Sequence, residues 1–160
     1  VEDDMLEVAR GFLERSDVDH CEILLPVDCV AAEKMEPDAE YRTVGIDGIP
    51  GGWMGLDIGP DSVVKFRESI SDARTIIWNG PMGVFEIEAF SHGTFGIAEC
   101  VTNSAAQTIV GGGETDAAIH QAGLADKVSF ISTGGGAFLE FLEGKELPGV
   151  AALKAACQNG

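Results

Sequence analysis

Positive charge is scarce in this sequence: 10 lysine and arginine residues stand against 27 aspartate and glutamate residues, a formal net charge of −17 at pH 7. This excess of negative charge repels polyanions, so nucleic acid and anionic membrane surfaces are disfavoured as partners. No apolar run is long enough to span a bilayer, and the acidic start, residues 1–4, lacks the cationic flank of a signal or transit peptide. The cytoplasm is therefore the expected compartment.

Cysteine pairs and common hydrolase signatures are missing as well. The four cysteines show neither a C-x-x-C pair nor a zinc-type spacing, so we expect reduced, mostly buried thiols. The three histidines are not at metal-ligand spacing from a second ligand type, and we expect them at the surface or at helix ends. These residues are Cys21, Cys29, Cys100 and Cys157, and His20, His92 and His120. Without a G-x-S-x-G elbow, an H-E-x-x-H motif or paired carboxylates, hydrolase functions have little support.

Length and hydrophobic patterning predict one α/β domain. The chain has 160 residues, 45% of them hydrophobic, which is enough for a single core. Helices are expected over residues 5–13, from Pro60, and over 94–103, 114–121, 136–143 and 150–156, with strands over 22–25, 75–78, at Thr108 and over 128–132. The glycine-rich residues 41–59 suggest a small hairpin or excursion at the sheet's edge. The alternation predicts a doubly wound, mostly parallel sheet with helices on both faces, a Rossmann-like three-layer sandwich.

Three of the expected strands run directly into glycine-containing turns, at residues 78–83, 111–113 and 134–136. In open parallel sheets, ligands bind beyond the carboxyl ends of the strands. Glycine there lets a phosphate approach backbone N–H groups without an intervening Cβ. A phosphorylated ligand is therefore the first hypothesis.

The turn at residues 111–115 has the features of a phosphate cradle. Gly112 and Gly113 offer free N–H groups at the positive end of a helix dipole, and the Thr115 hydroxyl adds a donor. Glu114 would repel phosphate unless a magnesium ion lies between them. The structural alternative is a tight strand-to-helix turn in which Glu114 only stabilises the helix N-terminus.

A second cradle follows one strand later, because Gly135 and Gly136 open the next helix in the same way. Two helix N-termini facing one crevice could share the charge of a phosphoryl group in transfer. The dinucleotide fingerprint fails, since it would need glycine at the positions of Asp116 and Leu139, and the P-loop fingerprint fails for lack of a lysine. A dinucleotide-dependent oxidoreductase is therefore disfavoured, and the cations that phosphoryl transfer normally uses must come from elsewhere.

The third turn, residues 78–86, suits an adenosine. Asn79 supplies an amide at a strand end, Pro81 and Val84 form a rigid apolar wall, and Glu86 offers a carboxylate to ribose hydroxyls. The structural alternative is a loop that buries its aromatic side chains and leaves Glu86 in solvent.

Together these segments closely resemble the C-terminal, nucleotide-binding domain of the phosphoglycerate kinase family. The matching segments are residues 25–28 (LPVD), 57–60 (DIGP), 78–86 (WNGPMGVFE), the two glycine triplets, and 142–150 (LEGKELPGV). The resemblance implies reversible phosphoryl transfer between 1,3-bisphosphoglycerate and MgADP, giving 3-phosphoglycerate and MgATP in glycolysis. It also implies that the chain is a partial domain, inactive alone, whose catalytic lysine and N-terminal phosphoglycerate-binding domain lie outside it. A non-catalytic nucleotide-binding or interaction domain derived from the kinase is the alternative.

Carried over by position, the resemblance assigns roles to the turn residues. It implies that Glu86 binds ribose, that Pro81 and Val84 line the adenine, and that the nucleotide phosphates are held by Asn79, Gly112, Gly113 and Thr115. Gly135 and Gly136 would present N–H groups to the phosphoryl group in flight, with Gly113 counted among these catalytic glycines. Glu114 would be the magnesium ligand, in place of the family's aspartate. Two further departures from the family, Phe130 and Phe138, are expected to be packing changes.

Overall fold

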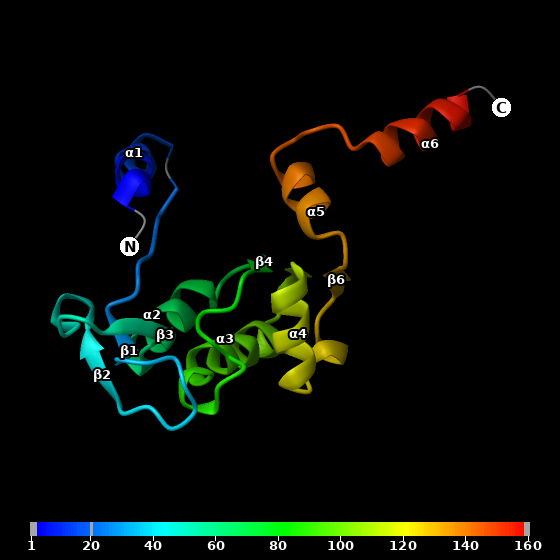
Figure 1. Ribbon diagram of the computed structural model, residues 1–160. Coiled ribbons are helices and arrows are strands. Elements are labelled where there is room, and N and C mark those ends of the chain that lie inside the picture. Colours follow the sequence, from blue (N-terminus) through cyan, green and yellow to red (C-terminus); the bar gives the residue numbers. More distant parts are fainter. Residues whose placement is uncertain (1–2, 20, 159–160) are drawn as a thin grey trace.

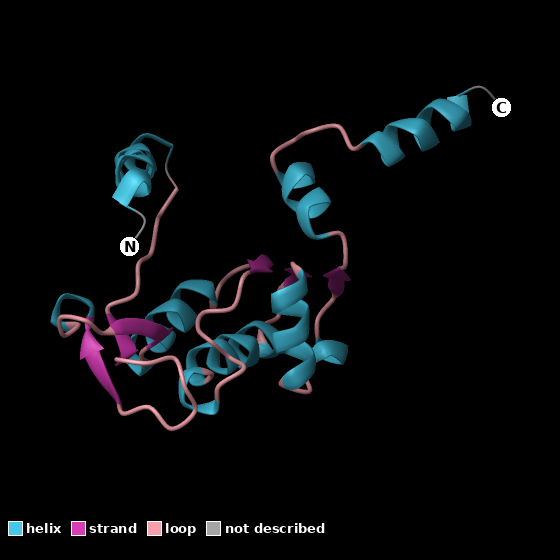
Figure 2. Ribbon diagram, in the orientation of Figure 1, coloured by secondary structure: helices cyan, strands magenta, loops and turns pink. Residues whose placement is uncertain are grey.

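The structure is a computed structural model that describes residues 3–19 and 21–158. Within these residues, six strands form two separate three-stranded sheets, with helices packed against them (Figures 1 and 2). The expected α/β class, with a parallel sheet and helices, is confirmed. Only one of the two sheets is parallel, however, so the sheet content is less uniform than the alternation of elements predicts.

The antiparallel sheet is built around β1 (Asp28–Ala32), which lies between β2 (Tyr41–Gly45) and β3 (Met54–Ile58). All five residues of β1 are buried, which suits a central strand. Of the hairpin or edge excursion expected over residues 41–59, the hairpin is wrong, because β2 and β3 each pair with β1 and not with each other; the two strands do form the edges of this sheet. A strand between two neighbours is usually covered on both faces, and the five buried residues of β1 fit that central place better than the mostly exposed residues of β2 do.

The strand expected over residues 22–25 is also a wrong prediction. These residues have no regular secondary structure, and the strand begins at Asp28 instead. A β-strand exists only where its backbone groups bond to a neighbouring strand. Within the described part of the chain, β1 has such a neighbour on both edges, whereas residues 22–25 have none.

The parallel sheet has the order β4 (Thr75–Asn79), β5 (Gln107–Gly111) and β6 (Phe130–Ser132). These are the strands expected over 75–78, at Thr108 and over 128–132, and they are confirmed. Their register aligns Asn79 with Gly111 and Gly111 with Ser132, so the three carboxyl ends lie side by side.

The helices α2 (Pro60–Ile70), α3 (His92–Asn103) and α4 (Gly113–Gln121) enclose the main core. Ile76 and Trp78 of β4 are buried there, while Ile77 on the opposite side of the strand is 45% exposed. Helical cover is therefore incomplete on that face of β4. The core cluster consists of Ile58, Ile76, Trp78, Ile97, Ala98, Val101, Val110 and Ile119, and the expected apolar face of α2, residues Val63, Phe66 and Ile70, packs against it.

Three further helices, α1 (Leu6–Asp19), α5 (Gly135–Leu142) and α6 (Pro148–Gln158), extend away from this body (Figure 1). The helix expected over 5–13 is confirmed, but its apolar side is exposed, with Phe12 at 59%. Short 3₁₀ segments lie at Asp3–Met5, Ile46–Gly48, Glu88–Phe90 and Ala125–Lys127. None of the described helices combines the length and the hydrophobicity needed to span a membrane.

The exposure of each cysteine depends on whether it lies among the packed elements β1–β6 and α2–α4 or on the helices α1 and α6 and their connections. All four cysteines are unpaired, as expected, but only Cys29 is buried; Cys100 is half-buried and Cys21 and Cys157 are exposed. The expectation of mostly buried thiols is wrong because Cys21 lies between α1 and the body and Cys157 lies on α6. His92 and His120 are exposed near ends of α3 and α4, as expected, and His20 lies outside the described residues.

Candidate functional site

The predicted site residues lie at the carboxyl edge of the parallel sheet. Asn79 ends β4, Gly111 ends β5 and Ser132 ends β6, and the register places the three ends next to one another. Helices α4 and α5 both begin at this edge (Figure 1). The first N–H groups of a helix have no partner within it, so this edge presents backbone donors toward solvent.

A hydrogen bond joins the first two turns. The Gly80 N–H donates to Thr115 Oγ1 across 2.7 Å, and Thr115 is 1% exposed. Gly80 and Gly112 have φ values of 103° and 89°, a left-handed conformation that favours glycine. A hydroxyl oxygen that accepts one bond still has its own proton to donate. The Thr115 hydroxyl can therefore still donate to a phosphate oxygen, as predicted. By accepting the Gly80 N–H it also joins the two turns, a structural role that the sequence did not indicate.

The Asn79 side chain lies against the second turn. A Cβ placed on Gly112 would be 3.5 Å from Asn79 Nδ2, from Asn79 Oδ1 and from Thr115 Oγ1. A Cβ on Gly111 would meet the Phe138 ring at 2.3 Å, so the backbone of β5 lies directly on this aromatic ring of α5. The packing role expected for Phe138 is confirmed. The one expected for Phe130 is wrong, because its side chain is 59% exposed.

The remaining nucleotide-site candidates share one hollow of about 440 Å³. Pro81, Val84 and Glu86 line it together with Glu114, which lies in the first turn of α4. The apolar wall and both carboxylates are therefore brought together, although they come from segments about thirty residues apart. Met35, Gly83, Phe85 and Ile87 complete the lining.

Met35 is a lining residue that the sequence reasoning missed. It belongs to the connection between β1 and β2 and is 55% exposed. The available signal was an apolar side chain within an otherwise charged turn, Glu33-Lys34-Met35-Glu36. Because that turn is distant in sequence from residues 81–87, no local pattern placed it at the hollow.

The backbone of residues 82–84 is held by contacts from beneath. Thr94 Oγ1 accepts N–H bonds from Met82 at 3.0 Å and Gly83 at 3.1 Å, and the Val84 N–H donates to the Leu56 carbonyl at 2.9 Å. Asp57, next to Leu56 on β3, is 4% exposed. Burial raises the pKa of Asp57 to about 6, although the N–H donors of Gly93 and Ile58 and the nearby His92 lower it.

The predicted catalytic glycines are positioned as helix starts. Gly113 and Gly135 begin α4 and α5, and Gly135 has a φ of 40°. A Cβ on Gly113, Gly135 or Gly136 would meet no atom within 4 Å. The backbone at these positions is thus open to a ligand, and glycine is not required there by packing.

Glu114 is suited to one particular kind of metal site. In the described part of the chain, no group of three or more His, Cys, Asp or Glu side chains could hold a metal ion. Magnesium in phosphoryl-transfer sites is typically bound by one or two carboxylates together with substrate phosphates and water. The exposed Glu114 carboxylate, at a helix start beside the glycine turn, fits that arrangement and does not fit an all-protein cage.

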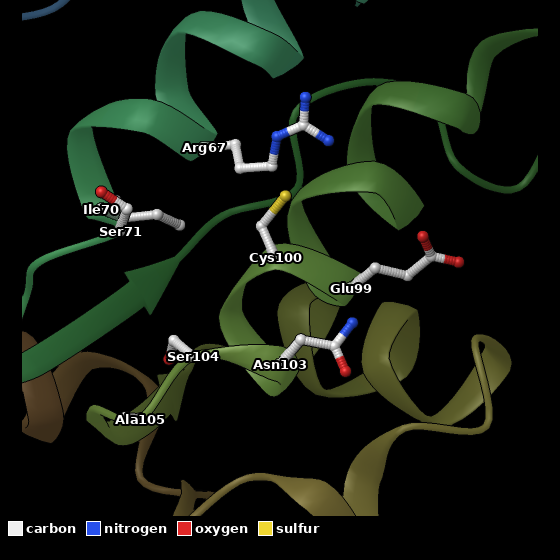
Figure 3. Close-up of a pocket in the computed structure, with 8 residues that line it drawn as sticks. All are labelled: Arg67, Ile70, Ser71, Glu99, Cys100, Asn103, Ser104 and Ala105. Atoms are coloured by element: carbon white, nitrogen blue, oxygen red, sulfur yellow. The ribbon is translucent and has the colours of Figure 1, made fainter.

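A second hollow, of about 360 Å³, lies where α2 and α3 end, away from the glycine turns (Figure 3). Its lining includes Arg67 and Cys100, whose sulfur points toward the Arg67 side chain. Burial raises the pKa of the Cys100 thiol, with Arg67 acting in the opposite direction and Glu99 in the same one. A thiol of raised pKa is a poor nucleophile at neutral pH, so we assign this hollow no catalytic role.

Comparison with known proteins agrees with this geometry. The phosphoglycerate kinase family model matches residues 1–145. The phosphoglycerate kinase of Thermosipho africanus is 59% identical over 157 residues, which are 96% of this chain and 39% of that protein. That of Geobacter metallireducens is 54% identical over 160 residues, covering 100% of this chain and 39% of that protein.

Solved structures give the same result. Phosphoglycerate kinase from Coxiella burnetii matches with a TM-score of 0.87 and 44% identity, over 90% of this chain and 38% of that one. The enzyme from Pyrococcus horikoshii matches with a TM-score of 0.78 and 32% identity, over 95% of this chain and 39% of that one. The chain thus spans about 39% of the length of the curated relatives it matches. With a family model that matches 145 residues and the same fold in two solved relatives, this chain belongs to the phosphoglycerate kinase family.

Proposed function

We propose that this chain is part of the C-terminal nucleotide-binding domain of a phosphoglycerate kinase. The parent enzyme would transfer a phosphoryl group reversibly between 1,3-bisphosphoglycerate and MgADP, giving 3-phosphoglycerate and MgATP in glycolysis. The observation that carries the proposal is the common hollow of Pro81, Val84, Glu86 and Glu114 beside the joined glycine turns. The family match favours this kinase activity over the oxidoreductase considered from the sequence.

The hollow would hold the nucleoside. Pro81 and Val84 are apolar and would contact the adenine, while Glu86 is exposed and would accept hydrogen bonds from ribose hydroxyls. The hollow continues to Glu114, so a nucleoside bound there would direct its phosphates toward α4.

The glycine turns would hold the phosphates. Gly112, Gly113 and Thr115 surround the start of α4, and Asn79 lies against the same turn. The N–H groups at the starts of α4 and α5, from Gly113, Gly135 and Gly136, would stabilise the charge of the phosphoryl group in transfer. Glu114 would hold magnesium, which neutralises phosphate charge when bound.

The chain would depend on partners outside it. Its net charge of −17 repels phosphorylated substrates, so cationic groups must be supplied by the N-terminal phosphoglycerate-binding domain and by the remainder of the kinase. We therefore propose that this chain alone binds nucleotide weakly and does not turn over, and that the parent enzyme acts in the cytoplasm. A non-catalytic nucleotide-binding domain would share the binding but never the turnover.

Calorimetric titration of ADP into the chain, with and without magnesium, tests the proposal. We expect weak, magnesium-dependent binding that is reduced in the Glu86→Gln variant. Glu68→Gln provides a matched control, since it makes the same exchange at an exposed position of α2 that does not line the hollow. An affinity that changes neither with magnesium nor with the Glu86→Gln substitution would contradict the proposal.

A further inference from the structure

We propose that Asp57 and Thr94 are positioning residues for nucleotide recognition, holding the backbone of residues 82–84 so that Pro81, Val84 and Glu86 face the hollow. The inference rests on the proposed function and names two residues that contribute no atom to the predicted nucleotide contacts. It assigns them a role in binding in addition to their role in the core.

Thr94 is placed to fix two consecutive peptide groups. It is 0% exposed in the first turn of α3, and its Oγ1 accepts the N–H groups of both Met82 and Gly83. Residues 81–84 have no regular secondary structure to satisfy these donors. A buried N–H without an acceptor is costly, so two of the N–H groups of this segment depend on one hydroxyl group.

Asp57 supports the same segment from β3. Its Oδ2 accepts the Gly93 N–H at 2.7 Å and its Oδ1 accepts the Ile58 N–H at 2.9 Å. A Cβ on Gly83 would lie 2.3 Å from Asp57 Oδ1, so the backbone at Gly83 rests directly on this carboxylate. A Cβ on Gly93 would lie equally close, at 2.3 Å. Asp57, on β3, thus fixes how closely the start of α3 and the backbone of residues 82–84 approach that strand.

The two residues act as one support. Asp57 anchors Gly93, the neighbour of Thr94, and a carboxylate at a helix N-terminus is favoured by the helix dipole. Leu56, the other neighbour of Asp57, accepts the Val84 N–H. Of three consecutive N–H groups, those of Met82 and Gly83 are therefore bound by Thr94 and that of Val84 by the residue preceding Asp57.

The charge state of Asp57 provides a separate readout. Burial raises its pKa to about 6, while the N–H donors of Gly93 and Ile58 and the nearby His92 of α3 act in the opposite direction. Another titratable group near Asp57 is the Cys29 thiol of β1, which lines the same small hollow between the antiparallel sheet and residues 81–84. A protonated carboxyl is a weaker acceptor than a carboxylate, so the grip on Gly93 weakens as pH falls through about 6.

Thr94→Val tests the support while preserving side-chain shape. We expect MgADP affinity to fall by about tenfold or more, because the N–H groups of Met82 and Gly83 both lose their acceptor, with Thr94→Ser restoring it to within about twofold. Thr108→Val is the matched control: Thr108 is 3% exposed and accepts the Ser129 N–H at 2.9 Å, but it lies in the interior of β5, short of the carboxyl-edge turns. It should lower the melting temperature and leave MgADP affinity unchanged. Equal affinity loss in both variants would overturn the inference.

Hydrogen exchange in the nucleotide-free chain separates this inference from the proposed function. Thr94→Val should speed exchange at the Met82 and Gly83 amides, while Thr108→Val should not. If the unsubstituted chain bound no MgADP, the proposed function would fail, and the exchange result would still decide whether Thr94 holds the segment. Unchanged exchange in Thr94→Val, in a chain that stays folded by circular dichroism, would overturn the inference.

Asp57→Asn gives the pH readout. The amide cannot titrate, so MgADP affinity should fall less steeply in the variant than in the unsubstituted chain as pH drops through about 6. Protonation of the ADP phosphate, whose second pKa is also about 6, lowers affinity equally in both proteins and cancels in the comparison. A merely structural role for Asp57 would leave the two affinity profiles parallel.

Discussion

The Ser62 hydroxyl donates to Asp28 Oδ1 across 2.6 Å and so ties the start of β1 to the first turn of α2. The same carboxylate accepts the N–H groups of Ser62 at 2.8 Å and Asp61 at 3.1 Å. A Cβ on Gly59 would lie 2.1 Å from Asp28 Oδ2, which leaves room only for glycine before the helix. This cap connects the antiparallel sheet with the helix that packs under β4.

Replacing Asp28 with alanine should destabilise the chain. The substitution leaves two helix N–H groups and a buried hydroxyl without their charged acceptor, and we expect a loss of about 2–4 kcal/mol in the free energy of unfolding. Urea denaturation followed by circular dichroism measures it. Asp47→Ala, on an exposed 3₁₀ segment, should change the midpoint little.

The two buried carboxylates should give opposite pH dependences of stability. Burial alone would raise the pKa of Asp28, but the hydrogen bonds from Ser62 and Asp61 outweigh it and hold the pKa below its ordinary value. Its stabilising contribution is therefore present above about pH 4 and is lost as pH falls further. The pKa of Asp57 is raised to about 6, so the folded state holds that proton more tightly and its contribution declines as pH rises from about 4 to 6.

Thermal melts of the unsubstituted chain and of Asp57→Asn between about pH 4 and 6 check the direction predicted for Asp57. The stability of the unsubstituted chain relative to the variant should decrease between about pH 4 and 6, the window in which its MgADP affinity should increase. A difference in melting temperature that stays constant over this window would contradict the assignment of the raised pKa to Asp57.

Gly83→Ala should be among the more damaging glycine substitutions. The added methyl group would lie 2.3 Å from Asp57 Oδ1 and 2.7 Å from the Asp57 Cα, so the backbone must shift. We expect a loss of about 1–3 kcal/mol in unfolding free energy. Gly51→Ala, where a Cβ meets no atom within 4 Å, should cost much less in the same denaturation experiment.

Glu86 should discriminate nucleotides by their sugar. If its carboxylate binds ribose hydroxyls, ADP should bind more tightly than 2′,3′-dideoxy-ADP, and Glu86→Gln should reduce that preference. Each lost charge-assisted hydrogen bond corresponds to about tenfold in affinity. An unchanged preference in the variant would place the ribose elsewhere.

Glu114 should control the response to magnesium. Glu114→Ala should bring the affinities for ADP with and without magnesium together, and Glu114→Asp should retain the difference, since it keeps a carboxylate at the start of α4. Asp126→Ala removes a carboxylate from an exposed 3₁₀ segment and should leave the magnesium response intact.

Local patterns were sufficient for much of this molecule. The strands and helices on either side of the glycine turns were predictable because each unit of β4, α3, β5 and α4 has its own hydrophobic period and its own turn residues. The grouping of Asn79, Gly112 and Thr115 followed, since parallel strands end at one edge.

Pairing and support contacts were not predictable from local patterns. The sequence of residues 22–25 is as strand-like as that of β1, and only a neighbouring strand decides between them. Met35 and Thr94 belong to no motif, and Asp57 lies in the matching segment 57–60 but received no role from it. All three reach residues 81–87 through contacts that bring together parts of the chain far apart in sequence.

Strand β4 pairs with β5 on one side, and on its other side the described residues contain no strand. An unpaired edge with an exposed isoleucine, Ile77, is a template for a strand from another molecule. In concentrated solution such pairing would compete with ligand binding and mask weak affinity. Titrations of this chain should therefore be repeated at several protein concentrations, because the dilute limit alone reports the affinity of the monomer.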